Sequence, residues 1–179
     1  MYVVGDPMLD TLNRFCPIPK TDDYRTYNVL TLHRNFNADN KEALKNVLDA
    51  IKESGEKFVF PIHPRTKKNL KAMGLKIPQN LCVIDPLPYG EMLKLISNAK
   101  RVLTDSGGVQ KEAFWMNVPV IILRNETEWT EICTQKGGVL VGTDKAKILD
   151  AIHNFKSKLS SPPEFGANKR IREALYKYV

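Results

Sequence analysis

The feature that most constrains the fold is a regular alternation along the chain. From Tyr27 onward, short runs of β-branched or aliphatic residues are each followed by a helix-like segment, giving six strand-then-helix units. The runs are YNVLTL, KFVFPI, LCVI, RVLT, VPVIIL and VLVG. They are continuously apolar instead of alternating, which is typical of strands buried on both faces of a parallel sheet. The sequence therefore predicts an α/β fold with a Rossmann-like, doubly wound parallel sheet.

The helix-like segments and the two chain ends suggest how the molecule is divided. In the segment after the first run, apolar residues recur at helical spacing, and Gly55 stands where a terminating residue is expected. A short helix is expected around Met8 to Phe15, and GANKRIREALYKYV predicts a last helix. We expect residues 1–26 to be an interdomain linker or edge segment, residues 27–160 the Rossmann-like domain, and residues 161–179 a crossover helix.

Charge and cysteine content limit the kinds of partner and the cellular compartment that we expect. The chain has 179 residues and a net charge of +7, which favours an anionic ligand, but many lysines lie on predicted helix faces, so nucleic acid is not the expected partner. Cys16, Cys82 and Cys133 have no metal-ligand spacing, which favours a reducing compartment without a metal site. No run has the length of a membrane span or the profile of a signal peptide. We expect a cytoplasmic protein with no metal or cofactor and no membrane partner.

Ligands of such sheets bind beyond the carboxyl ends of the strands, so the loops that follow the strands are the places to search. These loops are LHRNFN, PIHPRT, IDPLPY, TDSGG and LRNETEW. All except IDPLPY, which offers mainly backbone, carry polar or charged side chains that could converge on one ligand.

The TDSGG loop has two functional interpretations. DSGG also surrounds the nucleophile of chymotrypsin-like proteases, but those are disulfide-stapled antiparallel barrels, whereas this loop joins a parallel-type strand to a helix. In a strand–glycine–helix turn, free backbone N–H groups and the helix dipole favour an anion, and Gly107 and Gly108 allow it to approach closely. Ser106 would add a hydroxyl, and Glu112 could accept hydrogen bonds from a ribose diol. A purely structural tight turn is an equal alternative on this loop alone.

The loops after the first two strands each carry a histidine. His33 and Arg34 directly follow the first strand, where an imidazole and a guanidinium could both contact a diphosphate. His63 repeats this arrangement with Arg65, but a loop that caps a helix through Thr66 is the favoured alternative there.

The LRNETEW loop is similarly ambiguous. Arg124 could bind the ligand, or it could form a surface ion-pair cluster with Glu126 and Glu128. Trp129 is expected to pack.

Taken together, these loops resemble the carboxyl-terminal half of the non-hydrolysing UDP-N-acetylglucosamine 2-epimerases. The matching stretches run in order along nearly the whole chain. They are VVGDPMLDTL, TLHR, FPIHPRT, IDPLPY, LTDSGGVQKEA, LRNETEWTE, LVGTD and PPEFGANKRIREAL. The resemblance implies one half of a glycosyltransferase B-type architecture, in which a UDP-sugar lies between two Rossmann-like halves, and a role in cell-envelope polysaccharide biosynthesis.

The resemblance also implies roles for individual residues. The diphosphate would be held by Ser106, Gly107 and Gly108, and the ribose hydroxyls by Glu112. The backbone at Leu87 and Met92 would contact the uracil. His33 would approach the diphosphate and assist the reaction as the catalytic residue, and Arg34, His63 and Arg124 would complete the substrate-binding set. Two positions depart from the family pattern: Phe36 replaces the glutamate of HRxEN, and Trp129 replaces an arginine, as in members with ETEW.

The family reaction eliminates UDP from the sugar and adds it back with C2 inverted, using carboxylates that belong to the amino-terminal half. Because Met1 falls at the interdomain segment, we expect the chain to be inactive without an amino-terminal epimerase domain. The alternative is a non-catalytic module that binds UDP or UDP-GlcNAc. Apolar surface left exposed on the side of the missing half predicts either that partner domain or a homo-oligomer.

Overall fold

The computed structural model describes residues 2–15, 26–158 and 165–177, and its centre is a parallel sheet of six strands. Along the sheet the order is β3-β2-β1-β4-β5-β6. The strands are β1 (Asn28–Thr31), β2 (Phe58–Pro61), β3 (Leu81–Ile84), β4 (Val102–Thr104), β5 (Val120–Ile122) and β6 (Gly138–Leu140). The chain reverses its direction of travel across the sheet between β1 and β4. The predicted doubly wound α/β fold is confirmed.

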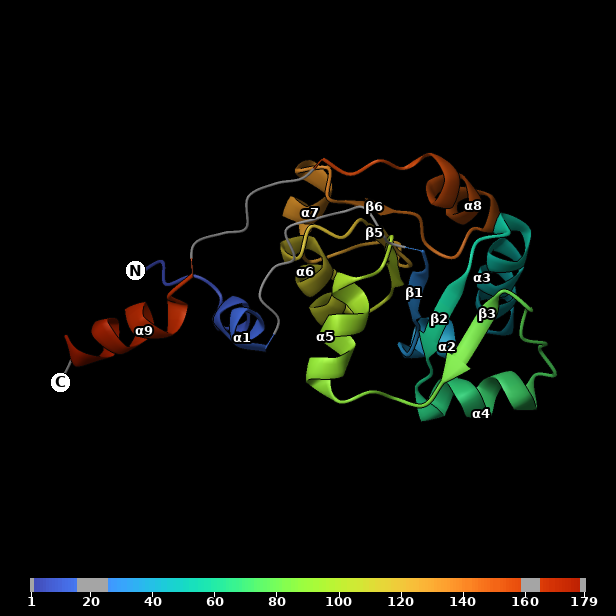
Figure 1. Ribbon diagram of the computed structural model, residues 1–179, viewed down its shortest axis with the longest axis horizontal. Helices are drawn as coiled ribbons and strands as arrows, with labels where there is room; N and C mark the ends of the chain where they lie inside the picture. The colour runs from blue at the N-terminus through green and yellow to red at the C-terminus, as the bar shows by residue number, and fades with distance from the viewer. Residues whose placement is uncertain (1, 16–25, 159–164, 178–179) are drawn as a thin grey trace.

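Helices cover both faces of this sheet (Figure 1). They are α1 (Pro7–Phe15), α2 (Asn35–Ala38), α3 (Lys41–Ser54), α4 (Pro64–Ala72), α5 (Tyr89–Ser97), α6 (Gly107–Trp115), α7 (Thr130–Thr134), α8 (Lys145–Asn154) and α9 (Ala167–Tyr176). Side chains of α3, α4 and α8 build one core cluster, including Leu44, Leu70 and Ile148. Side chains of α1, α5, α6 and α7 build the other, including Leu93 and Ile132.

The burial of the strands follows their place in the sheet. Every residue of β1, β4 and β5 is buried, as their continuous apolar runs predict. The strands β2, β3 and β6 are only partly buried. The strands β3 and β6 form the two edges of the sheet, where covering helices protect fewer side chains, and β2 lies next to the edge strand β3.

Local signals explain where α3 begins and ends. The Asn40 side chain accepts hydrogen bonds from the N–H groups of Glu42 and Ala43, at 3.0 and 3.1 Å, which caps the amino end of the helix. Gly55 closes it at φ 68°, in the left-handed region that glycine adopts without strain. The predicted termination at Gly55 is therefore confirmed.

Helix α1 packs on the domain and also contacts the last helix. Leu9 and Leu12 of α1 are fully buried in the cluster beneath α5 and α6. The Asp10 carboxylate accepts hydrogen bonds from the N–H groups of Gly166 and Asn168, at 2.6 and 2.8 Å. Figure 1 shows α1 and α9 side by side, away from the sheet. Cys16 lies outside the described residues. None of the helices in the described segments has the length and apolarity needed to cross a membrane.

Candidate functional site

Asp105 joins two of the predicted loops at the carboxyl edge of the sheet. This carboxylate follows β4 directly and is completely buried. It accepts hydrogen bonds from the N–H groups of His33 at 3.2 Å and Arg34 at 3.0 Å, and from Asn37 Nδ2 at 3.2 Å. Because β1 and β4 are neighbours at the point where the strand order reverses, one acidic side chain can fix both turns. The geometry holds His33 and Arg34 beside Ser106.

Hydroxyl groups reinforce the same junction. Thr31 Oγ1 and Thr104 Oγ1 lie 2.5 Å apart at the ends of β1 and β4. Thr104 Oγ1 also accepts a hydrogen bond from the N–H of Ser106 at 2.9 Å. The turn that carries the two glycines is therefore held at its start by a strand residue.

Burial favours the uncharged form of the His33 imidazole, although Asp105 lies nearby. Its Nδ1 is 3.6 Å from Asp105 Oδ1, and about a third of the side chain is exposed. Burial lowers the pKa of His33, and the nearby charges of His63 and Arg34 lower it further, against the opposing effect of Asp105. The His33 and His63 rings are 5.8 Å apart, so the two predicted histidines are brought together.

The amino end of α6 is open. Within the described residues, the Ser106 side chain makes no capping hydrogen bond to α6, and the first helical bond runs from the N–H of Gln110 to the carbonyl of Ser106 at 3.0 Å. The three preceding N–H groups, beginning at Gly107 and Gly108, thus have no partner within the helix. Such a helix end is suited to an anion.

The loop after β5 closes over this helix end. A methyl carbon placed on Gly107 would lie 3.1 Å from Trp129 Nε1, which is a tight contact. Thr127 Oγ1 donates to Gln110 Oε1 at 2.8 Å and accepts from the N–H of Trp129 at 3.2 Å. Lys111 Nζ lies 4.1 Å from the centre of the Trp129 ring. Trp129 thus packs, as expected, and it packs on the phosphate-binding candidate itself.

Arg124 lies in this loop and is paired. Its guanidinium donates to both carboxylate oxygens of Glu128, at 2.8 and 2.9 Å. The ion-pair interpretation of this segment is confirmed for Arg124 and Glu128.

Glu112 is buried in α6, with 4% of its surface exposed. Burial raises the pKa of its carboxyl group from 4.5 to about 7, outweighing a hydrogen bond from the Tyr89 hydroxyl and the charge of Lys111. Burial, together with the charge of Glu112, also raises the pKa of Tyr89. Tyr89 begins α5, so Glu112 lies beside the segment that holds Leu87 and Met92.

The two predicted uracil contacts lie in that segment. Leu87 is partly exposed. The N–H of Met92 donates to the carbonyl of Pro88 at 2.9 Å, within the first turn of α5. Contact between uracil and the backbone of either residue stays a prediction.

The PIHPRT loop caps a helix, but not through the expected residue. His63 Nδ1 accepts a hydrogen bond from the N–H of Arg65 at 3.2 Å, so His63 is the capping side chain of α4. Thr66 is buried inside the helix and donates to the carbonyl of Leu32 at 2.5 Å. Thr66 as the cap was therefore wrong. The Arg65 side chain pairs with Asp39.

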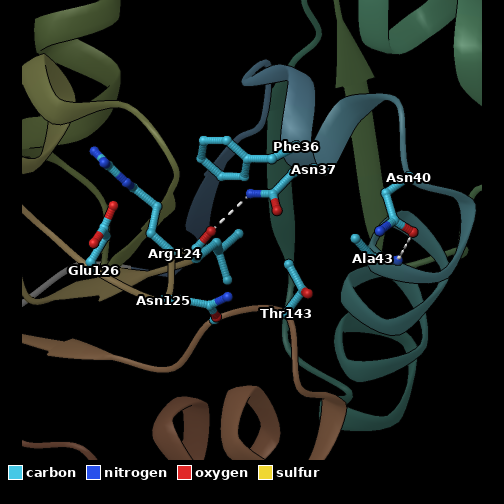
Figure 2. A pocket seen from close by; sticks show the side chains of 10 residues that line it. Phe36, Asn37, Asn40, Ala43, Arg124, Asn125, Glu126 and Thr143 are labelled. Atoms are coloured by element: carbon cyan, nitrogen blue, oxygen red, sulfur yellow. Dashed lines mark hydrogen bonds between the residues drawn. The ribbon is translucent and has the colours of Figure 1, made fainter.

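A cavity of about 280 Å³ adjoins the site on the α3 side of the sheet (Figure 2). It lies between α2, the start of α3 and the loops after β5 and β6. The Phe36 ring is half exposed there and lies 5.9 Å from the Arg124 guanidinium. Asn37, drawn in Figure 2 with its hydrogen bond, donates to the carbonyl of Leu123 at 2.8 Å. Because the same amide also donates to Asp105, Asn37 both lines the cavity and belongs to the Asp105 junction.

Sequence reasoning missed Asp105 and Gln110 as the residues that organise the site. Asp105 had a detectable signal, because an acid that directly follows a buried central strand must find donors inside the fold. Gln110 had none, since its partner Thr127 lies in another loop.

Comparison with known proteins places this arrangement in context. The sequence profile described as UDP-N-acetylglucosamine 2-epimerase matches residues 1–175. A UDP-N-acetylglucosamine 2-epimerase homolog of Methanococcus maripaludis is 42% identical over 169 residues, covering 87% of this chain and 47% of that protein. A UDP-2,3-diacetamido-2,3-dideoxy-D-glucuronate 2-epimerase of Pseudomonas aeruginosa is 41% identical over 131 residues, covering 72% of this chain and 36% of that protein.

A solved structure gives the same result. The Methanocaldococcus jannaschii UDP-GlcNAc 2-epimerase, in complex with UDP-GlcNAc and UDP, superposes with a TM-score of 0.86 at 35% identity, covering 99% of this chain and 55% of that one. This chain thus spans about half the length of the relatives it matches. The matched span and the fold agree that the chain belongs to the UDP-N-acetylglucosamine 2-epimerase family.

Proposed function

We propose that this chain binds the UDP part of UDP-GlcNAc at the carboxyl edge of its sheet, as the carboxyl-terminal domain of a UDP-GlcNAc 2-epimerase. The diphosphate lies at the amino end of α6, against Ser106, Gly107 and Gly108. Glu112 accepts hydrogen bonds from the ribose, and the backbone near Leu87 contacts the uracil.

The observation that carries this proposal is the junction at Asp105. It fixes the β1 turn, with His33 and Arg34, next to the open amino end of α6. An imidazole, a guanidinium and the N–H groups that have no partner within α6 then border one small region, and each can donate to a phosphate oxygen. His63, whose ring adjoins that of His33, borders the same region.

The same geometry supports a division of labour between domains. Moving the C2 proton of the sugar needs a carboxylate that can accept and release it. Asp105 is fully buried and occupied by three donors, and Glu128 is paired with Arg124. We propose that the acid–base carboxylates come from an amino-terminal domain, that His33 assists, and that residues 1–26 and 161–179 connect to that domain.

Binding tests the first part of the proposal. Calorimetric titration should show UDP binding more tightly than ATP. Glu112→Gln should weaken the binding of UDP but leave the binding of inorganic pyrophosphate unchanged. The wild type should bind 2′-deoxy-UDP about as weakly as Glu112→Gln binds UDP. Equal weakening of UDP and pyrophosphate by Glu112→Gln would remove Glu112 from the ribose site, and no UDP binding at millimolar concentration would refute the proposal.

Activity tests the second part. The chain alone should not interconvert UDP-GlcNAc and UDP-ManNAc, and addition of the amino-terminal domain of a full-length relative should restore turnover. Turnover by the chain alone, abolished by a substitution within it, would show that the division of labour is wrong.

A further inference from the structure

The carboxylate of Glu128 lies where three sources of positive potential converge. Arg124 holds both of its oxygens, at 2.8 and 2.9 Å. The hydrogen bond from Arg124 is the main reason that the pKa of Glu128 lies below its ordinary value, and the charge of Arg34 lowers it further. A methyl carbon placed on Gly107 would lie 4.0 Å from Glu128 Oε2, so the carboxylate also adjoins the open end of α6.

The amino end of α6 and Arg34 are groups that the proposed function assigns to the diphosphate, and Arg124 holds the carboxylate that lies beside them. A guanidinium presents the same donor fork to a carboxylate as to a phosphate, so Arg124 can hold one partner or the other with equal geometry. Two anions placed together at the end of α6 would repel each other. Glu128 therefore occupies the position of an anion while no ligand is bound.

Exposure indicates which partner of the ion pair would move. The Glu128 side chain is 60% exposed, whereas that of Arg124 is only 11% exposed and lies against Phe36. Glu128 can turn into solvent and be hydrated, while Arg124 is held near the site by its surroundings.

We propose that Glu128 is a built-in competitor of the ligand, and that the diphosphate displaces it from Arg124 and from the amino end of α6. This inference rests on the proposed function. An anion can bind the Arg124 guanidinium only if it displaces the bidentate carboxylate of Glu128. Glu128 therefore helps to determine specificity for diphosphate and weakens the affinity for the ligand.

The test is Glu128→Gln, with Glu126→Gln as the matched control, since it removes the same charge from the same exposed loop. Glu128→Gln should bind UDP and pyrophosphate about two- to fivefold more tightly, the equivalent of one exposed ion pair. Uridine affinity should not change, because uridine has no phosphate to displace the carboxylate. Glu126→Gln should bind UDP like the wild type.

The same substitution made in an Arg124→Gln variant tests whether Glu128 competes with the ligand for Arg124. In Arg124→Gln, the further change Glu128→Gln should gain less than it does alone, because the shared guanidinium is absent. Three outcomes would each overturn this inference and leave the proposed function standing. They are a UDP affinity that is unchanged or weaker in Glu128→Gln, an equal gain in affinity in Glu126→Gln, and a full gain in affinity without Arg124. Failure of every variant, wild type included, to bind UDP or pyrophosphate would overturn the proposed function and this inference together.

Discussion

Two strand-to-helix turns at the same edge of the sheet end in opposite states. At α4, Pro64 has no N–H to satisfy, and His63 accepts a hydrogen bond from the N–H of Arg65 at 3.2 Å. At α6, glycines occupy the first two positions, and the side chain of the preceding Ser106 makes no capping hydrogen bond in the described part of the chain. The chain caps one helix end with its own side chain and leaves the other without a cap from Ser106.

The difference teaches that the ligand preference of a turn depends on its unsatisfied groups. Both turns contain a polar residue, His63 or Ser106, that the sequence makes a candidate for ligand binding, with a structural role for the loop as the alternative. One ring nitrogen of His63 accepts a hydrogen bond from α4, whereas the Ser106 hydroxyl makes no capping hydrogen bond to α6. The following predictions test this contrast.

The largest effect is expected from closing the open turn. In Gly107→Val, the new side chain would meet Trp129 Nε1, which lies 3.1 Å from the Cβ position, and would block the approach of an anion to the backbone. The free energy of UDP binding should weaken by more than about 3 kcal/mol, which is the contribution of two hydrogen bonds to a charged group. Titration calorimetry measures this. Gly90→Ala is the control, since its methyl group would make an ordinary 3.6 Å contact. Wild-type affinity in Gly107→Val would mean that the anion binds elsewhere.

The next effect concerns the residue that places the open turn. Asp105→Asn would replace one carboxylate oxygen with an NH2 group, so that some of the donors from His33, Arg34 and Asn37 would lose their acceptor. We expect the free energy of unfolding to fall by about 3 kcal/mol, measured by urea denaturation. Asp85→Asn should change it by less than about 0.5 kcal/mol, because the Asp85 side chain is 88% exposed. Similar losses in both variants would contradict an anchoring role for Asp105.

Paired substitutions at the two turns should have reciprocal effects. Ser106→Ala should weaken UDP binding by about 1.5–3 kcal/mol at most and leave stability unchanged, because no cap is lost. His63→Ala should lower stability by about 1 kcal/mol, because a cap is lost. Binding curves and thermal unfolding of both variants check this. Covalent reaction of Ser106 with a fluorophosphonate would instead indicate an attacking serine.

The smallest effect is a pH dependence within α6. Because burial raises the pKa of Glu112 to about 7, the folded state holds this proton more tightly than the unfolded state. Its contribution to stability is present below the unfolded value of 4.5 and is lost as pH rises through 7. Wild type should lose about 1 kcal/mol between about pH 6 and about pH 8 from this group. Glu112→Gln should lack that part of the slope in urea titrations at both pH values, and an identical slope would contradict the burial effect.

Much of the fold follows from the sequence because each strand is a short apolar run with its own flanking signals. The run LCVI coincides with β3, and Gly55 ends α3 as expected. The short helix α2 was not predicted, since NFNA lacks a helical apolar pattern and is held by the Asp105 junction through Asn37. Helix α6 begins at Gly107, so both glycines of the TDSGG loop are helical although glycine has a low helix propensity.

The candidate site was predictable as a set of loops and less so as a set of contacts. Placing His33, Arg34 and Ser106 together needed only the rule about carboxyl ends of parallel strands. The ion pair of Arg124 with Glu128 was one of two interpretations of the LRNETEW loop, and the contacts in the structure decide for it. Thr66 was wrong as a cap because α4 begins at Pro64, which places His63 at the N-cap position. The Thr66 hydroxyl lies inside the helix and donates instead to the carbonyl of Leu32.

The contact between α1 and α9 has a consequence for how the molecule opens. The hydrogen bonds from Gly166 and Asn168 to Asp10 join residues 156 and 158 positions apart, whereas the strands are joined by much shorter connections. Ala167 is the buried residue of α9, so little apolar surface holds that helix. The last helix should therefore detach and reattach while the sheet stays intact, and its amide hydrogens should exchange with solvent long before those of β1 and β4.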